Sequence, residues 1–413
     1  MKRIRMLHFA DVHIGMENYG SVDPKTGLNG RVVDFLRRFS EMIDYGLEHR
    51  VDLAVFAGDA YKQRNPNPTY QRAFAKRVKQ LADAGVPVVL VVGNHDLPTM
   101  TQKATAVDIF STLDVQNVIV GRDYEVHTVQ TRRGPVQVAT VPYPIRQRLL
   151  TDEEYRGLSI DDLDAALQAI VTQTIEGLRR SLNPDWPAVL AAHLSVSSAK
   201  YGSERSVMIG RDAVIAKSAL DDPAWDYVAL GHIHKHQSLN GDKQPPMVYA
   251  GSMERIDFGE EGDPKGFCWV ELPAAGSQAE TTWRFVELNA RRFVTIRADV
   301  REAEDPLSAL REVIARHTID QAVVRLIIQL HPEQEPALRD RDLRALLSDA
   351  YSIGSISREV ERKARVRLGD QAPEEMTDRE LLERYLEVKE MPPDRIPALL
   401  SHADRIFSAG EDD

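Results

Sequence analysis

Short runs of consecutive apolar residues alternate with longer amphipathic stretches through the first part of the chain. Residues 88–92 form an unbroken apolar run, which is typical of a strand buried on both faces of a sheet. Similar runs predict further strands over residues 4–9, 52–57, 188–192, 227–230 and 247–250, and amphipathic stretches predict helices over 31–50 and 70–84. The order strand, helix, strand, helix, strand at the start predicts an α/β fold.

The pattern changes after about residue 273. Strands are predicted over residues 293–300, 322–330 and 359–368, and helices over 306–317 and 336–350. None of these strands ends in a residue of the type that binds metals, so the segment is expected to form a separate small α+β module. A polar linker at 369–373 leads to two short amphipathic helices, over 378–389 and 393–407. We therefore expect three parts, made of residues 1–278, 285–370 and 371–413.

Composition and charge narrow the class of protein. The chain is 43% hydrophobic and 28% charged, which is ordinary for a globular protein. No apolar run approaches the roughly 20 residues of a membrane span, and a cytoplasmic protein is expected. The single cysteine, Cys268, excludes a cysteine-based metal site. The net charge of −11 argues against a nonspecific basic nucleic-acid binder, although bound divalent cations and a local basic face can outweigh the average.

Polar side chains that can bind metals follow the predicted strands of the first part. Seven of them have oxygen or imidazole donors: Asp11, His13, Asp59, Asn94, His193, His232 and His234. Such a mixed set suits two first-row cations such as Mn²⁺, Fe²⁺ or Zn²⁺ better than an oxygen-only Ca²⁺ or Mg²⁺ site. Two cations about 3.5–4 Å apart need a bridging ligand, and a carboxylate is the natural choice. Asp59 is the expected bridge, because it lies alone at its strand end, between the other groups in the sequence.

His95 is left as a non-ligand next to Asn94. It is expected to face a phosphate substrate, where it protonates the leaving oxygen or stabilises charge on the phosphorus. Asp96 is predicted to orient the His95 ring by accepting a hydrogen bond from its far nitrogen. Each of these short motifs is common by chance, and only their joint order after buried strands favours a metal site.

The order Asp-x-His, Gly-Asp, Gly-Asn-His-Asp, His, Gly-His-x-His resembles the calcineurin-like metallophosphoesterase superfamily. Within it, the chain resembles the SbcD-type nucleases in Leu7-His8 before Asp11, in Gly-His-Ile-His-Lys at 231–235 and in Gly-Ser-Met-Glu-Arg-Ile-Asp-Phe-Gly-Glu at 251–260. The resemblance in sequence covers residues 1 to about 275. The remainder of the chain resembles these nucleases only in the order of its domains. It implies a two-sheet sandwich flanked by helices, a small α+β domain that caps DNA, and a helical C-terminal tail.

The resemblance also implies roles for the donor residues. One metal would be held by Asp11, His13, Asp59 and His234, and the second by Asp59, Asn94, His193 and His232. It implies two manganese ions and cleavage of DNA phosphodiester bonds, exonucleolytically from 3′ ends of duplexes and endonucleolytically in single strands or hairpins, during processing of double-strand breaks. It further implies an SbcC-type coiled-coil ATPase bound through residues 376–408, a homodimer formed through 70–84 and 104–113, and association with the nucleoid. From the residues alone, the tail helices could instead pack on the parent domain, and plain core packing is an equal alternative for 70–84 and 104–113.

Other residues have weaker assignments. The loop that leaves Asp59 carries Lys62 and Arg64, and it is expected either to follow a DNA backbone or to be an ordinary solvated loop. Arg146 and Arg148 are weaker candidates of the same kind. His8 lies inside a predicted strand and is expected to be a hydrogen-bonded core residue.

Two alternative functions stay open. The first is a two-metal phosphatase or cyclic-nucleotide phosphodiesterase of the same fold, which has no need of the additional module and tail. The second is a metal-free scaffold, which should have lost some of the seven donors. The chain has no Gly-x-x-x-x-Gly-Lys phosphate-binding loop, so any dependence on ATP must come from a partner.

Overall fold

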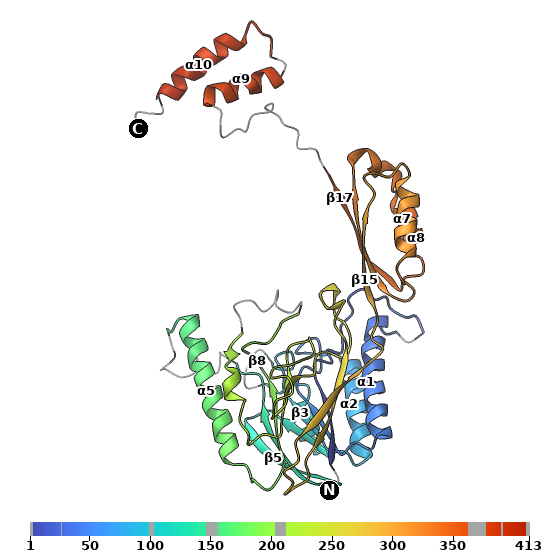
Figure 1. Cartoon of the computed structure of the whole chain (residues 1–413), viewed down its shortest axis with the longest axis vertical. Coiled ribbons are helices and arrows are strands. Elements are labelled where there is room, and N and C mark those ends of the chain that lie inside the picture. Colours follow the sequence, from blue (N-terminus) through green and yellow to red (C-terminus); the bar gives the residue numbers. More distant parts are fainter. Residues whose placement is uncertain are drawn as a thin grey trace. The chain divides into compact units, whose positions relative to one another are not determined.

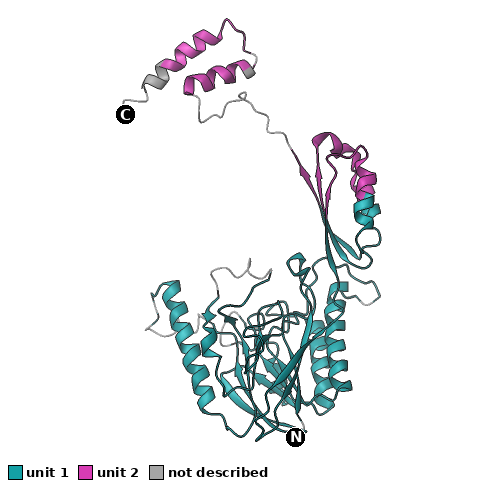
Figure 2. Cartoon of the chain, in the orientation of Figure 1, with its two compact units in different colours: residues 1–296, 311–326, 344–356 teal, residues 297–310, 327–343, 357–413 magenta. Residues whose placement is uncertain are grey.

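The computed structural model describes residues 3–25, 27–98, 103–145, 155, 157–202, 212–361, 377–389 and 391–409. The chain divides into two compact units, the first made of residues 1–296, 311–326 and 344–356 and the second of residues 297–310, 327–343 and 357–413 (Figure 2). Among the described residues, none of the helices combines the length and the apolar character needed to cross a membrane. The predicted division into 1–278, 285–370 and 371–413 stays a prediction.

The first unit contains two mixed sheets of six strands each. The first sheet has the order β14–β13–β1–β2–β3–β4. Its strands β1 to β4 are parallel, and β13 and β14 are antiparallel to their neighbours. The bounds are Ile4–Phe9 for β1, Leu53–Phe56 for β2, Val88–Val91 for β3, Val118–Gly121 for β4, Gly266–Leu272 for β13 and Thr282–Glu287 for β14.

The second sheet has the order β11–β12–β10–β7–β6–β5. Its four inner strands are parallel, and the edge strands β5 and β11 are antiparallel to their neighbours. The bounds are Glu125–Thr131 for β5, Gly134–Val141 for β6, Ala188–His193 for β7, Tyr227–Gly231 for β10, Gln237–Ser238 for β11 and Met247–Tyr249 for β12. A two-stranded sheet joins β8 (Ser195–Val196) to β9 (Val214–Ile215).

Alternating side chains place the sheets face to face between helices. In β1, Leu7 and Phe9 belong to the core shared with helices α1 (Gly30–Glu48) and α2 (Pro68–Asp83), whereas Met6 belongs to the core between the two sheets. Helix α5 (Ile160–Arg180) packs its apolar side on the outer face of the second sheet. Figure 1 shows α1 and α2 on one side and α5 on the other. This four-layer arrangement is the predicted two-sheet sandwich.

The predicted elements of this unit agree with the structure to within a few residues. Helix α2 begins earlier than predicted, because Asn67 accepts a hydrogen bond from the Tyr70 amide as N-cap and Pro68 occupies the first turn. Helix α3 (Asp108–Thr112) lies within the predicted 104–113 contact region.

The later elements follow the predicted order with two corrections. The strands β15 (Phe293–Asp299), β16 (Val323–Leu330) and β17 (Ser352–Val360) form a three-stranded sheet in that order, and α7 spans Pro306–Ala315. The helix predicted over 336–350 is shorter than expected: α8 spans Asp340–Leu346, and a separate 3-10 helix at Pro332–Ala337 precedes it, because the backbone at Leu338 (φ −102°, ψ 78°) is not helical. Strand β17 ends where the strand predicted over 359–368 was to begin, and residues 362–368 lie outside the described residues. The tail contains α9 (Asp378–Val388) and α10 (Ile396–Ala409).

Candidate metal centre

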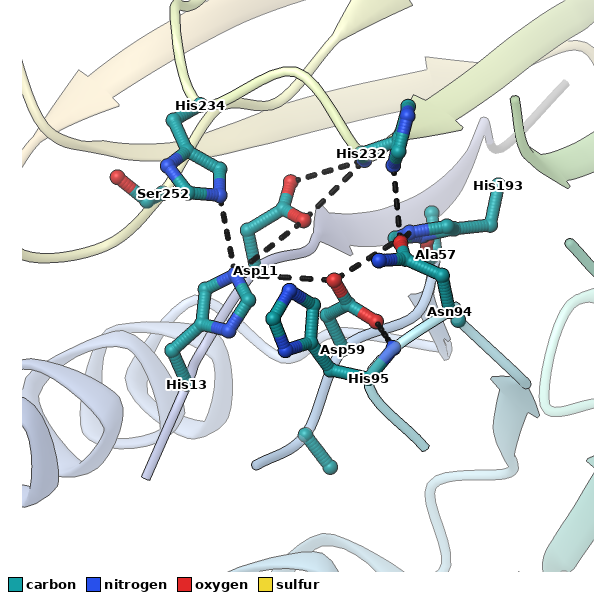
Figure 3. A network of polar contacts seen from close by, with 12 residues as sticks. Asp11, His13, Ala57, Asp59, Asn94, His95, His193, His232, His234 and Ser252 are labelled. Carbon is teal, nitrogen blue, oxygen red and sulfur yellow. Dashed lines mark hydrogen bonds and ion pairs between the residues drawn. The ribbon is translucent and has the colours of Figure 1, made fainter. Parts of the chain in front are cut away.

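The seven predicted donors come together where strands of the two sheets end. Asp11 and His13 follow β1, Asp59 follows β2 and Asn94 follows β3, all in the first sheet. The other three come from the second sheet, with His193 at the end of β7 and His232 and His234 after β10. Figure 3 shows the two groups facing one another. Carboxyl ends of parallel strands are where α/β folds place ligands, which explains why distant motifs meet here.

One half of the cluster contains His13 and His234. Their Nε2 atoms lie 3.0 Å apart, a distance at which two unprotonated imidazole nitrogens leave their lone pairs facing one another. The same His13 Nε2 lies 3.9 Å from Oδ1 of Asp11 and 3.7 Å from Oδ2 of Asp59. Two imidazole nitrogens with two carboxylates within 4 Å of one of them are a donor set for a divalent cation.

The other half contains Asn94, His193 and His232. The Asn94 Oδ1 atom lies 2.9 Å from Nε2 of His193 and 3.0 Å from Nδ1 of His232. The Asp59 Oδ2 atom lies 3.5 Å from the same His193 nitrogen, so this carboxylate stands between the two halves. Its position agrees with the predicted bridging role, which stays a prediction.

Among the residues that the structure describes, imidazoles and carboxylates form three triads whose donor atoms are close enough to hold one ion. These are Asp11 with His13 and His234, Asp11 with Asp59 and His193, and His13 with Asp59 and His95. Two triads consist of predicted ligands only, and the third includes His95, which is predicted to be a non-ligand. The residues fit a pair of cations in the chemistry of their donors, and the assignment of each residue to a metal remains a proposal.

Burial makes these charges interdependent. Asp11, His13, Asp59 and His193 are all buried. Burial opposes the ionised form of Asp59, but the surrounding histidines, His193 first, outweigh it and hold the pKa of this carboxyl well below its usual range. Burial would lower the pKa of His193, but Asp59 outweighs it and raises that pKa to about 9. The pKa of Asp11 is raised by burial, and burial also brings the pKa of His13 well below its usual range.

The backbone that carries the ligands is strained. Asp11, His13 and Asp59 have φ values of 51°, 46° and 64°, a region that residues other than glycine seldom adopt. Hydrogen bonds hold this geometry, since the Asp11 amide donates to the Gly58 carbonyl at 3.0 Å and the His13 amide donates to the Asp59 carbonyl at 3.1 Å. Strain of this kind is typical of functional sites, where the surrounding structure fixes a costly conformation.

Asp96 does not orient His95, so that prediction is wrong. Its carboxylate accepts hydrogen bonds from three backbone amides, those of Asp59 at 2.9 Å, Ala60 at 3.0 Å and Gly93 at 3.0 Å. The His95 ring is oriented instead by the Lys62 carbonyl, which lies 2.7 Å from Nδ1. A carbonyl can only accept, so Nδ1 carries a proton in this contact.

The loop after Asp59 lies beside the site. Lys62 and Arg64 line a hollow of about 410 Å³ together with Asn94 and His95, so the structure brings both basic residues next to two predicted site residues. Their contact with DNA stays a prediction. Arg146 and Arg148 lie outside the described residues.

Two carboxylates behind the histidines were not predicted as site residues. Asp212 Oδ2 lies 2.6 Å from Nε2 of His232, and Glu260 Oε1 lies 2.9 Å from Nδ1 of His234. Burial raises the pKa of Asp212, but its hydrogen bond with His232 outweighs this and brings the pKa to about 2. Glu260 belongs to the 251–260 run that carries the family resemblance, which was a signal for its importance, whereas no motif surrounds Asp212.

Comparison with known proteins agrees with this fold and site. A model of the calcineurin-like phosphoesterase family matches residues 4–236, more than half of the 413-residue chain, and the chain therefore belongs to this family. The chain is also 28% identical over 297 residues to the D subunit of the nuclease SbcCD of Bacillus subtilis (strain 168), covering 70% of each protein. Among solved structures, a dimetal phosphatase from Danio rerio has a TM-score of 0.38 at 12% identity, covering 68% of this chain and 99% of that one. A Thermus thermophilus protein has a TM-score of 0.36 at 11% identity, with 69% and 99% covered.

Proposed function

We propose that this protein is a manganese-dependent DNA nuclease that processes double-strand breaks together with an SbcC-type ATPase. It would act as a 3′–5′ exonuclease on duplexes and as an endonuclease on single strands and hairpins. The observation that carries the proposal is the position of Asp59 between two groups of imidazoles, in a chain similar to a nuclease subunit over 70% of both proteins. A two-cation centre of this kind suits hydrolysis of phosphodiesters.

In the proposed site, one cation is held by Asp11, His13, Asp59 and His234, and the other by Asp59, Asn94, His193 and His232. When bound, such ions lower the pKa of a water molecule and neutralise charge on a phosphate. The burial of the ligands excludes bulk water, which strengthens electrostatic interactions inside the site.

His95 is proposed to act on the leaving oxygen. Because the Nδ1 proton is held by the Lys62 carbonyl at 2.7 Å, the doubly protonated ring would deliver its other proton from Nε2 and return to the neutral Nδ1–H form. Lys62 and Arg64, on the hollow that also contains His95, are proposed to bind backbone phosphates on either side of the cleaved bond. These two cationic side chains would form a local basic face, which can attract the DNA backbone although the net charge of the whole chain is −11.

Exposed apolar residues support the proposed partners. In the tail, the Tyr385 side chain is 52% exposed and Leu399 is 36% exposed, whereas Leu386 and Leu400 are buried. A helix pair that keeps apolar side chains in solvent suits docking on another helix, here the ATPase coiled coil, through residues 376–408. Ile109 in α3 is 47% exposed and Leu113 is 68% exposed, which supports the proposed homodimer contact.

The test is cleavage of end-labelled duplex, single-stranded and hairpin DNA in Mn²⁺ and in Mg²⁺, with and without the ATPase. His95→Asn should retain its manganese and lose turnover, whereas Asp59→Ala should lose both. Manganese content is measured separately on each protein. The DNA assignment is overturned if the metal-loaded protein with its partner leaves all three DNAs intact but hydrolyses a phosphomonoester or a cyclic nucleotide. A fully active His95→Asn variant would overturn the role of that residue.

A further inference from the structure

A buried ion pair lies directly behind His234. Glu260 and Lys265 are both 0% exposed, and the Lys265 Nζ atom lies 2.9 Å from Oε2 of Glu260. The other carboxylate oxygen, Oε1, lies 2.9 Å from Nδ1 of His234. Lysine and glutamate are almost never fully buried unless they are paired, so this pair needs an explanation.

The pair is saturated with hydrogen bonds. Besides Glu260, the Lys265 ammonium donates to the Ser252 Oγ atom at 2.9 Å and to the His234 carbonyl at 3.2 Å, which uses all three of its donors. Glu260 Oε2 also accepts from the Ile256 amide at 2.9 Å. Lys265 therefore holds the backbone of His234 and, through Glu260, its ring.

The two residues are also fixed by the fold. Glu260 ends the short 3-10 helix η3 (Phe258–Glu260), and its carbonyl accepts from the Arg255 side chain at 3.2 Å. Lys265 directly precedes β13, and its carbonyl accepts from the Leu288 amide at 2.8 Å. These hydrogen bonds fix the backbone positions from which both side chains reach His234.

The chemistry of the contact decides the protonation of His234. An ionised carboxylate can only accept a hydrogen bond, so Nδ1 of His234 must carry the proton. The ring then has its lone pair on Nε2, the atom that lies 3.0 Å from Nε2 of His13 and belongs to the triad with Asp11.

We propose that Glu260 and Lys265 are positioning residues that keep His234 in the Nδ1-protonated tautomer, so that Nε2 is presented to a metal ion. This inference rests on the metal centre of the proposed function. A buried ion pair often contributes little to stability, which favours a role in orienting His234 over one in holding the fold together. Partners of this kind typically change metal affinity about 10–100-fold when they are removed.

The test replaces the pair by a neutral one of similar size, Glu260→Gln together with Lys265→Met, in the full chain. The side-chain amide introduced by Glu260→Gln can donate as well as accept, so it no longer dictates the tautomer. Histidine ¹H–¹⁵N correlation spectra of the metal-free protein should show His234 as the Nδ1–H tautomer in the natural protein and as a mixture in the double variant. Manganese titration should show one of two ions bound about 10–100-fold more weakly.

The matched control is Asp52→Asn. It neutralises a buried carboxylate that lies away from the metal centre and accepts a hydrogen bond from the Arg5 amide at 2.9 Å. It should leave both manganese affinities and the His234 tautomer unchanged. The inference is overturned if the double variant keeps the natural tautomer and binds both ions with natural affinity. If the natural protein bound no manganese, the proposed function would fail, and the tautomer spectra would still decide this inference. If it bound two ions without cleaving DNA, only the proposed substrate would fail.

Discussion

The two sheets of the sandwich supply different chemistry to the same site. The first sheet contributes the oxygen donors Asp11, Asp59 and Asn94 together with His13, whereas the second sheet contributes imidazoles only. Two of the three candidate metal triads draw on both sheets, and the third, which contains His95, draws on the first alone. The centre is therefore assembled when the sheets pack, because neither sheet carries the full donor set.

The sheets also differ in how they hold their donors. In the first sheet, backbone amides fix the carboxylate, since the His95 amide donates to Asp59 Oδ1 at 2.9 Å. In the second sheet, each ring is fixed by an acceptor on its other nitrogen. For His193 this acceptor is the Ala57 carbonyl of the first sheet at 2.7 Å, and for His232 and His234 it is a carboxylate. The orientation of the second sheet's histidines thus depends on carboxylate side chains and on a carbonyl of the first sheet. Single substitutions can therefore test the contribution of each sheet to the site separately.

The largest effect is expected where the sheets touch at the site. A Cβ added to Gly231, at the end of β10, would lie 2.1 Å from the Ala57 carbonyl oxygen and 2.8 Å from the Ala10 Cβ. Gly231→Ala should therefore shift the two sheets, lower the rate of the proposed DNA cleavage about 100-fold or more, and cost about 1–3 kcal/mol in the free energy of unfolding. Cleavage assays and urea unfolding measure both effects.

The control for this prediction is Gly177→Ala. A Cβ at Gly177 in α5 would meet no atom within 4 Å, so this change should stabilise the protein by about 0.5–1 kcal/mol without affecting cleavage. Natural activity in Gly231→Ala would show that the sheets do not need this close approach.

A smaller effect is expected behind the second sheet. Asp212 lies 2.6 Å from His232 and accepts from the Tyr143 hydroxyl at 2.5 Å and from the Ser195 hydroxyl. Asp212→Ala should remove the acceptor that fixes Nε2 of His232 and weaken the binding of one of the two proposed manganese ions about 10–100-fold. It should not change the His234 tautomer, which Glu260 holds. Manganese titration tests the first statement and histidine spectra test the second, with Asp222→Ala as a partly exposed carboxylate control. Unchanged affinity for both ions would refute the supporting role.

The smallest effect on the site itself is expected for a contact that joins the sheets away from the donors. His8 in β1 pairs with the Tyr227 hydroxyl at 3.0 Å and the Leu230 carbonyl at 3.2 Å in β10, and burial lowers the pKa of this ring from 6.5 to about 3. Between these values the unfolded chain binds a proton that the folded protein does not. The free energy of unfolding therefore falls on acidification from pH 6.5 towards 3, by about 1.4 kcal/mol per pH unit at most.

His8→Gln keeps a donor and an acceptor but does not titrate in this range. In the metal-free protein, the unfolding free energy of this variant should fall less on acidification from about pH 6 to about pH 4 than that of the natural protein. The difference between the two slopes against pH should correspond to one bound proton. Urea unfolding at each pH measures this slope. Equal slopes would mean that His8 is protonated in the folded state.

The sequence predicted the donors well because they follow strands that could be recognised individually. The apolar run before Gly93 and the runs before Asp59 and His193 end at one edge of parallel sheets, so motifs far apart in the chain had to meet. The expectation that His8 is a hydrogen-bonded core residue is confirmed by its burial and its two partners.

The supporting residues could not be predicted in the same way. Asp212 lies in an irregular segment and Glu260 at the end of the short 3-10 helix η3, and nothing in their local pattern says which ring they contact. For Asp96, the prediction chose the neighbouring ring and overlooked backbone donors, including the Gly93 amide three residues earlier, to which a short Asp side chain readily turns. The helix predicted over 336–350 begins only at Asp340, because the backbone leaves the helical conformation at Leu338, which the apolar pattern does not reveal.

The three hydrogen bonds accepted by Asp96 have a consequence for transplanting the site. They tie the turn after β2 to the turn after β3, and these turns carry Asp59, Asn94 and His95. A designer who copied only the seven donors onto another parallel sheet would leave those turns free to separate. The smallest portable version of this centre therefore contains an eighth residue that touches neither metal nor substrate.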